Sequence, residues 1–476
     1  MEAPEAQWAS GASHNTLTKG EICMAREKLS SRLGFILLSA GCAIGLGNIW
    51  RFPFITGMYG GALFVLIYLV CLVILGIPIM TMEFAVGRGA NLSAAKAFQT
   101  LEKPGAKWHG FSWVAMFGNY LLMFFYTTVS GWMLAYFFKT AEGTFSGLSP
   151  DEIGGAFGGF ISNPGAAVVW MIAVCAIGFA VCAGGLVASV EKVGKFMMTG
   201  LFIIVGILAI RSITLPGAGA GLAFLLKPNL DGIRQHGLGR VIYAAMGQAF
   251  FTLSLGIGSM QIFGSYINKD RALFGEAVTV TILDTAAALL AGLVIFPACF
   301  AFGQNPGAGP GLIFVTLPNI FNSMPLGQFW GTLFFVFMVF AAMSTVIAVF
   351  ENIIAFAMEL TGCSRGRACL VNFFIVVAFS LFCALSFGVL SGFTLMGGVL
   401  DLEDFILSNN LLPLGALIYC LFCANKMGWG WDNFLNEANT GKGPKFPAVL
   451  KPYVAFVIPV IIVIIFVMGY IDIFGK

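Results

Sequence analysis

Residues 32–53 read RLGFILLSAGCAIGLGNIWRFP, an apolar stretch long enough to cross a membrane but interrupted by glycines at its centre. Each glycine costs about 1 kcal/mol of helix propensity relative to alanine, so a cluster favours local unwinding. A second cluster, FTLSLGIG at 251–258, interrupts the sixth apolar stretch. Close helix packing through small residues could explain either cluster alone. Their recurrence at corresponding positions favours a transporter built from two repeats, with a midplane binding site at the broken helices.

The composition predicts a polytopic membrane protein. Of 476 residues, 59% are hydrophobic and 10% are charged, whereas soluble domains are about one quarter charged. About 20 helical residues cross the roughly 30 Å hydrocarbon core. The sequence offers eleven such spans, at 33–56, 61–85, 112–139, 165–184, 190–212, 239–264, 275–302, 328–360, 368–389, 398–424 and 450–474.

The distribution of basic residues predicts the topology. The loops at 140–164 and 303–327 contain no Lys or Arg, which marks them as external by the positive-inside rule, although the loop at 213–238 is a minor exception. We therefore expect a multi-pass protein of the cytoplasmic membrane with a cytoplasmic N-terminus and an external C-terminus. The expected organisation is a flexible cytoplasmic tail at 1–28, a ten-helix core at 29–424, and a cytoplasmic loop with the eleventh helix at 425–476.

Several other classes of function find no support in the sequence. The basic residues follow topology and form no nucleic-acid face, and no obligatory protein partner is inferred. The cysteines are scattered without zinc-site or disulfide spacing. An enzyme is not expected, because His14, His109 and His236 lie in the tail or loops and no His-Glu-x-x-His motif occurs. An ion channel would share the spans but would need a continuous pore.

An ordered set of motifs carries a family resemblance. Besides residues 32–53, it comprises GGALFVLIYLV at 60–70, GIPIMTMEFAVGR at 76–88, Tyr126 six residues before Trp132, GQAFFTLSLGIG at 247–258, GPGLIFVTLP at 309–318 and the pair Ser344-Thr345. This set resembles the neurotransmitter:sodium symporter family, in its bacterial amino-acid transporter branch. The resemblance implies an all-α membrane protein of about eleven transmembrane helices, a 5+5 inverted repeat with helices 1 and 6 broken. It also implies sodium-coupled symport by alternating access.

The resemblance implies two sodium sites made of oxygen ligands, which suit a hard cation. The first would use Ala43, Asn48, Thr252 and Asp284. The second would use carbonyls of Gly41, Ile44 and Ala341 with the hydroxyls of Ser344 and Thr345. Serine and threonine in membrane helices often bond their own backbone instead. Asp284 is different, because an ionisable residue within a span is a functional candidate by default.

The resemblance also implies a substrate site between the broken helices. A carboxylate would meet the amides of Leu46 and Gly47 and the Tyr126 hydroxyl, and an ammonium group would meet carbonyls of Ala43, Phe251 and Thr252 near Ser254. The expected side-chain pocket consists of Cys42, Leu122, Phe251, Ile257, Thr345 and Val349. This pocket is mostly apolar, which favours a hydrophobic or aromatic amino acid. The alternative is the same fold carrying an amine, an osmolyte or an aromatic metabolite.

Two further pairs would act as gates by the same resemblance. Arg51 and Asp404 would close the external side, and Arg26 and Glu359 the cytoplasmic side. Exposed pairs are worth only about 0–1 kcal/mol, so they can form and break within a cycle. Leu29 occupies a position where the family often has tryptophan, which predicts a looser inner plug.

Two sequence differences bear on substrate and anion. Amine-carrying members of the family have an aspartate at the position of Gly45, so an α-amino acid, which brings its own carboxylate, is expected here. Chloride-requiring animal members have asparagine and, one turn later, serine at the positions of Asp284 and Ala288. A built-in carboxylate predicts transport without chloride, although Tyr68 and Gln248 match the chloride site of the family.

Overall fold

The computed structural model describes residues 27–307 and 311–474, and helices make up nearly all of this part of the chain. The predicted gate residue Arg26, most of the predicted tail and the start of the motif at 309–318 therefore lie outside the described residues. The first eleven helices are α1 (Arg32–Ala43), α2 (Phe52–Met58), α3 (Ala62–Cys71), α4 (Ile77–Ala90), α5 (Ala97–Leu101), α6 (Phe111–Ala141), α7 (Pro150–Ser162), α8 (Pro164–Ala183), α9 (Glu191–Ile213), α10 (Gly219–Leu226) and α11 (Asp231–His236).

The second half of the chain continues the helical pattern. Its helices are α12 (Leu238–Thr252), α13 (Ser259–Tyr266), α14 (Leu273–Ala301), α15 (Leu317–Asn322), α16 (Gly327–Thr361), α17 (Arg365–Leu385), α18 (Val399–Asp404), α19 (Leu412–Ala424), α20 (Trp431–Asn439) and α21 (Ile458–Phe474). Short π-helical or 3-10 segments join or flank many of them: η1 (Gly47–Arg51), η2 (Leu72–Gly76), η3 (Trp108–Gly110), η4 (Leu186–Val190), η5 (Leu312–Thr316), η6 (Leu395–Gly397), η7 (Phe405–Leu411), η8 (Ala448–Leu450) and η9 (Tyr453–Val457).

Nine continuous helices in the described part of the chain are long and apolar enough to span a membrane, and one bent pair adds a tenth. The bent pair joins α1 to Gly47–Met58 at an angle of 53° and corresponds to the first predicted span. The sixth predicted span, 239–264, is divided into α12 and α13, of 15 and 8 residues. Neither piece alone covers the roughly 30 Å hydrocarbon core at 1.5 Å per residue. The polytopic fold predicted from the composition is confirmed.

Both breaks fall within the glycine clusters, and in the sixth span the conformations of the glycines explain the break. In the first, helix α1 ends at Ala43 and Ile44 has an extended backbone conformation. In the second, Gly256 and Gly258 have φ angles of +93° and +73°, which glycine adopts without the steric cost that a Cβ would add. Ser254 also has a positive φ, of 52°. The unwound segments leave backbone N–H and C=O groups that need partners inside the protein.

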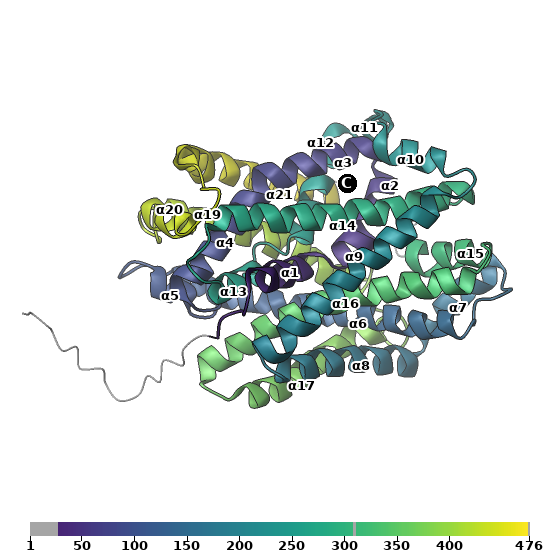
Figure 1. Cartoon of the computed structure of the whole chain (residues 1–476), viewed down its shortest axis with the longest axis horizontal. Coiled ribbons are helices and arrows are strands. Elements are labelled where there is room, and N and C mark those ends of the chain that lie inside the picture. The colour runs from purple at the N-terminus through teal and green to yellow at the C-terminus, as the bar shows by residue number, and fades with distance from the viewer. Residues whose placement is uncertain (1–26, 308–310, 475–476) are drawn as a thin grey trace, which may run out of the picture.

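The long helices run between two ends of the molecule (Figure 1). Helices α5 and α20, from segments predicted to be cytoplasmic, lie at the left in this view, whereas α7, α10 and α15 lie at the right. Helix α7 was expected only as part of a loop; a capping box between Ser149 and Glu152 begins it. The broken segments lie between these ends, where α1 packs against α9, α13, α14 and α16.

Candidate functional site

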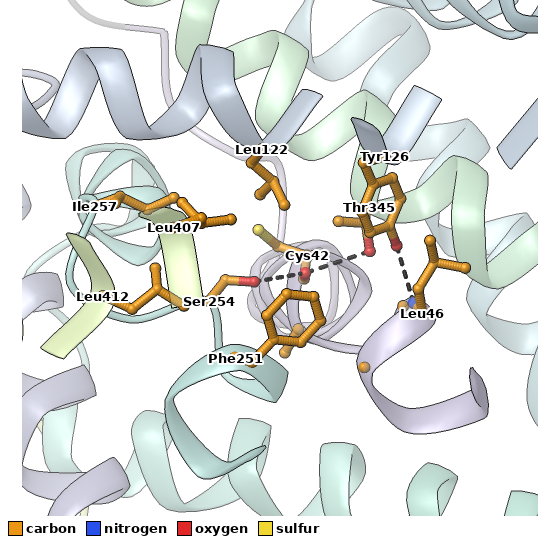
Figure 2. A pocket seen from close by; sticks show the side chains of 13 residues that line it. Cys42, Leu46, Leu122, Tyr126, Phe251, Ser254, Ile257, Thr345, Leu407 and Leu412 are labelled. Atoms are coloured by element: carbon orange, nitrogen blue, oxygen red, sulfur yellow. Dashed lines mark hydrogen bonds between the residues drawn. The ribbon is translucent and has the colours of Figure 1, made fainter. Parts of the chain in front are cut away.

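A cavity lies where the two broken spans meet helices α6 and α16 (Figure 2). Its volume is small, about 20 Å³, so the lining side chains largely fill it. Ten of the predicted substrate residues line it: Cys42, Ala43, Leu46, Gly47, Leu122, Tyr126, Phe251, Ser254, Ile257 and Thr345. The other two predicted residues, Thr252 and Val349, are buried but are not part of its lining. Gly45, Leu407 and Leu412 complete the wall.

The cavity has a polar end and an apolar end. At the polar end, the Leu46 N–H donates to the Tyr126 hydroxyl oxygen at 3.0 Å. Ser254 Oγ, which lies beside Leu412 in Figure 2, donates to the Cys42 carbonyl oxygen at 3.2 Å. At the other end, Figure 2 shows side chains of leucine and isoleucine around the same space. These are Leu122, Ile257, Leu407 and Leu412. This division suits a ligand with a charged head and an apolar body.

The side chains of Tyr126 and Thr345 pack closely against Gly45 at the polar end of the cavity. A Cβ atom on Gly45 would lie 2.2 Å from the Tyr126 hydroxyl oxygen and 2.4 Å from Thr345 Oγ1. Both distances are far shorter than any real carbon contact, so a larger side chain at Gly45 requires Tyr126 or Thr345 to move. The Tyr126 hydroxyl, which accepts a hydrogen bond from Leu46, can also donate its own proton to an acceptor.

The predicted residues of the first sodium site form one buried cluster around Asp284 of α14. Asn48 Nδ2 donates to Asp284 Oδ1 at 2.8 Å and to the Asp284 carbonyl oxygen at 3.0 Å. Thr252 Oγ1 lies 3.1 and 3.2 Å from the two carboxylate oxygens. Asn48 Oδ1 accepts from the Gly45 N–H at 3.2 Å. All three side chains of this cluster are fully buried. A carboxylate in such a place is costly unless it is hydrogen-bonded or close to a cation.

Two residues of the matching chloride-site pattern lie next to this cluster. The Tyr68 hydroxyl is 3.5 Å from Asp284 Oδ2. Gln248 Nε2 donates to the Gly47 carbonyl oxygen at 2.7 Å. Ala288, one turn beyond Asp284, is buried and has no polar group. The Tyr68 hydroxyl therefore faces the Asp284 carboxylate.

The predicted residues of the second sodium site also converge. Ser344 Oγ of α16 donates to the Ala341 carbonyl oxygen at 2.8 Å and lies 3.4 Å from that of Ile44. Thr345 Oγ1 lies 3.2 Å from the Gly41 carbonyl oxygen and 3.5 Å from that of Ile44. Helix α1 and helix α16 thus present five oxygen atoms to one another. Neutral oxygen donors at a helix C-terminus suit a monovalent hard cation.

Arg51 links the two broken spans to the tenth span. Its guanidinium lies 3.6 Å from Asp404 Oδ1 and donates to Ser408 Oγ at 3.0 Å. Ser408 Oγ in turn donates to Asp404 Oδ1 at 2.5 Å. The same guanidinium sits over the Phe251 ring, 4.6 Å from its centroid. The structure therefore brings the predicted external gate residues together directly above a residue that lines the cavity.

The predicted cytoplasmic pair can be described only on one side. Glu359, near the end of α16, accepts hydrogen bonds from the Ser93 N–H at 2.8 Å and from Ser93 Oγ at 2.6 Å. Leu29 is buried, and its N–H donates to the Tyr266 carbonyl oxygen at 3.2 Å.

Sequence reasoning missed one buried carboxylate of this region, Glu83 of α4. Its two oxygens accept from the N–H groups of Gly256 at 2.5 Å and Met260 at 3.2 Å. These amides belong to the break of the sixth span and the first turn of α13, so Glu83 satisfies donors that the unwinding exposes. Glu83 lies within the motif at 76–88, and an acidic residue inside an apolar span was the available signal.

Comparison with known proteins agrees with this geometry. The model of the sodium:neurotransmitter symporter family matches residues 26–147 and 157–474. A sodium-dependent transporter of Bacillus subtilis, YhdH, is 35% identical over 92% of this chain and 96% of its own length. A sodium-dependent transporter of Haemophilus influenzae is 31% identical over 93% and 98%. The crystal structure of MhsT in complex with L-phenylalanine has a TM-score of 0.85 and 39% identity, over 93% of this chain and 99% of that one.

The fold and these relatives define a sodium-dependent, multi-pass membrane transporter. More particularly, the chain belongs to the sodium:neurotransmitter symporter family. The family is one of transporters, and MhsT, a solved relative, shares the fold observed here.

Proposed function

We propose that this protein is a sodium-coupled symporter of a neutral amino acid with a hydrophobic or aromatic side chain. The observation that carries the proposal is the polar end of the cavity, where the Tyr126 hydroxyl meets the Leu46 N–H beside Gly45. A hydroxyl that accepts from one amide can donate its own proton to a carboxylate. The N–H groups at the start of the helical segment after the break also favour an anionic group.

The absence of a side chain at Gly45 favours an amino acid over an amine. A carboxylate at this position would supply a fixed partner for an amine, but the packing of Tyr126 and Thr345 leaves no room for one. An amino acid brings its carboxylate with it, and its body would be covered by the leucine and isoleucine side chains of the apolar end. Burying a Leu- or Phe-sized group contributes about 1.5–3 kcal/mol. MhsT, crystallised with L-phenylalanine, is a relative in which a ligand of this chemistry binds.

Two sodium ions are proposed per transport cycle. The cluster around Asp284 would hold the first, in contact with the substrate carboxylate, and the oxygens of α1 and α16 would hold the second. The two ions would repel each other where water is excluded, and the Asp284 carboxylate offsets this repulsion. For the same reason we propose that transport does not require chloride.

The membrane orientation follows from the charge distribution. We infer a cytoplasmic N-terminus and an external C-terminus in the cytoplasmic membrane, with residues 29–424 as the ten-helix core and 425–476 as an appended loop and helix. The segments assigned to the two sides gather at opposite ends of the molecule in Figure 1, which supports this topology. Modification of single introduced cysteines in α5 and α7 by an impermeant reagent on whole cells tests it, since only α7 should react.

A ligand screen tests the cargo. Purified protein would be heated with each of the twenty amino acids and with tyramine and tryptamine, in sodium gluconate or in potassium gluconate. A ligand at 100 times its dissociation constant stabilises by about 2.7 kcal/mol. We expect stabilisation by hydrophobic or aromatic amino acids in sodium alone. Stabilisation by tryptamine equal to that by tryptophan would overturn the proposal in favour of an amine.

A further inference from the structure

Residues 28–32, which precede and begin α1, form a polar segment tied to several neighbouring elements. Lys28 Nζ donates to Asn91 Oδ1 at 2.7 Å and to the Ser265 carbonyl oxygen at 2.8 Å. At the other end of the segment, Arg32 Nε lies 2.9 Å from a carboxylate oxygen of Glu276 on α14. The segment that leads into α1 is therefore attached to the residue that follows α4, to α13 and to α14. The Arg32 side chain is 45% exposed, so its ion pair is screened by water.

The strongest attachment of this segment is to Glu191, the first residue of α9. One oxygen of Glu191 accepts from the Ser30 N–H at 2.9 Å, and the other accepts from Ser30 Oγ at 2.6 Å and from Ser31 Oγ at 3.3 Å. Lys195, one turn along α9, lies 2.6 Å from the same carboxylate. The Glu191 side chain is only 1% exposed. Hydrogen bonds to a buried ionised group are the strong ones. We call Glu191 with Ser30 and Ser31 the α1 clamp.

Helix α1 is shaped to receive this carboxylate. A Cβ on Gly34 would lie 2.0 Å from Glu191 Oε1. The carboxylate thus rests directly against the backbone of the first turn of α1, where Ser31 Oγ also accepts from the Gly34 N–H at 3.1 Å. Any outward displacement of this turn must break the contacts with Glu191.

The opposite end of the same helix carries the carbonyl oxygens of Gly41 and Ile44 that face Ser344 and Thr345. Between the first turn and this carbonyl end, α1 is a continuous helix of 12 residues. The 53° bend after it gives a point about which it can turn. Because a short helix moves as one body, the position of its first turn and the position of its carbonyl oxygens are coupled.

We propose that Glu191 is a positioning residue of the transport cycle: the α1 clamp holds α1 where its carbonyl oxygens can bind sodium, and it must release Ser30 and Ser31 whenever this end of the transporter opens. Sodium bound at the far end of α1 and the clamp at its near end favour the same position of the helix. Each therefore strengthens the other, as two ligands of one conformation do.

The test measures sodium binding without any amino acid, so it is independent of the cargo. Wild-type protein and Glu191→Gln would be titrated with sodium gluconate against potassium gluconate at constant ionic strength, with thermal stability as the readout. We expect the half-saturating sodium concentration of Glu191→Gln to rise about tenfold, the effect of losing charge-assisted hydrogen bonds. Glu191→Asp, which keeps the charge, should recover part of the loss.

Amide hydrogen exchange of residues 27–40 distinguishes the proposed role of Glu191 from a merely structural one, because a structural role would not make this exchange depend on sodium. In the wild type, sodium should slow exchange in this segment; in Glu191→Gln, it should do so only at the higher sodium concentration. Ser30→Ala removes one hydroxyl from an exposed residue and should fold normally. Introduced alone, Ser30→Ala should weaken sodium binding. Introduced together with Glu191→Gln, it should weaken sodium binding little further, because the two residues act through one interaction.

Two controls separate the possible results. Glu152→Gln alters another glutamate that accepts from a serine N–H and hydroxyl, but in α7, far along the chain from α1; its sodium titration should equal the wild type. Ser344→Ala tests the second sodium site itself, on which this inference rests. Unchanged sodium binding in Ser344→Ala would refute that site. A sodium effect in Ser344→Ala with none in Glu191→Gln or Ser30→Ala would refute the clamp.

Discussion

Asp284 supplies the negative charge that is proposed to offset the two sodium ions. It is fully buried in the 29-residue apolar helix α14, and Asn48 and Thr252 share its carboxylate. Asp284→Asn keeps the shape but removes the charge that offsets two cations. We expect the half-saturating sodium concentration to rise at least about tenfold, because charged hydrogen-bonded groups contribute about 1.5–3 kcal/mol. Titrating purified protein with sodium in gluconate and in chloride measures this.

The anion dependence distinguishes the role of Asp284 from general damage. Wild-type binding should be the same in gluconate and chloride, whereas Asp284→Asn should become sensitive to chloride. Asp231→Asn, an exposed carboxylate in α11, is the control and should change neither. A wild-type protein that loses sodium binding in gluconate, or an Asp284→Asn protein with unchanged sodium dependence, would refute the assigned role.

Tyr126 is predicted to recognise the substrate carboxylate through a single oxygen atom. Tyr126→Phe keeps the buried ring and removes the hydroxyl that faces Leu46. Affinity for the amino acid should fall about tenfold to a hundredfold, the usual effect of losing a charge-assisted hydrogen bond, while an analogue without the carboxylate should be unaffected. Equilibrium binding of both ligands at saturating sodium measures the difference.

Tyr120 provides the matched control on the same helix. Its hydroxyl donates to Asn372 Oδ1 at 2.5 Å on α17 and does not line the cavity. Tyr120→Phe should leave amino-acid affinity unchanged. Equal losses in Tyr120→Phe and Tyr126→Phe would mean that the hydroxyl of Tyr126 has only a structural role.

At the scale of elements, the break in the sixth span depends on a residue in a different helix. Glu83 of α4 accepts from the amides of Gly256 and Met260. In Glu83→Gln, an amide NH₂ would face one of these N–H donors, and an unsatisfied buried donor costs about 1–3 kcal/mol. We expect a lower unfolding temperature and weaker amino-acid binding together. Thermal unfolding and amino-acid binding of Glu83→Gln, compared with those of Glu152→Gln, check this. An unchanged unfolding temperature and unchanged affinity would show that the break does not depend on Glu83.

The two glycine clusters made the breaks predictable. The side chains that accept hydrogen bonds from the exposed amides at these breaks could not be predicted. Gly256 and Gly258 stand in the sequence as a visible interruption, and a positive φ is what glycine permits. The partner of the exposed amides, Glu83, lies about 170 residues earlier, and no local pattern links the two. The contribution of Leu407 and Leu412 to the cavity was missed for a related reason. In a sequence, an apolar residue that lines a cavity cannot be told apart from one that packs against a neighbouring helix.

The residues around the cavity were largely predictable because the motifs carry them. Ten of twelve expected substrate residues line one cavity, and the expected oxygens of each sodium site lie together. Thr252 was expected in both the first sodium site and the substrate site: its hydroxyl bonds to Asp284, whereas Thr252 does not line the cavity. The side chain's direction depends on the exact point at which α12 unwinds, which composition does not specify.

For the whole molecule, alternating access requires that the external closure be weak enough to open in each cycle. The Arg51 and Asp404 side chains are 20% and 34% exposed and 3.6 Å apart, so their attraction is partly screened. Asp404→Asn should speed release of bound amino acid to the outside by up to about fivefold, equivalent to 0–1 kcal/mol. Dissociation rates from outward-oriented transporters measure this, and slower release would contradict a gating role for the pair.

The central claim, sodium-driven transport of a hydrophobic amino acid, is tested most directly by uptake of radiolabelled L-phenylalanine or L-leucine into proteoliposomes. With two sodium ions, a 100 mV potential and a tenfold sodium gradient supply roughly 7 kcal/mol, enough for about a 10⁵-fold accumulation. We expect accumulation above the external concentration with sodium outside, in gluconate as in chloride, and none when potassium or choline replaces sodium. Equal uptake in potassium, or no uptake of any amino acid where an amine is accumulated, would contradict the account.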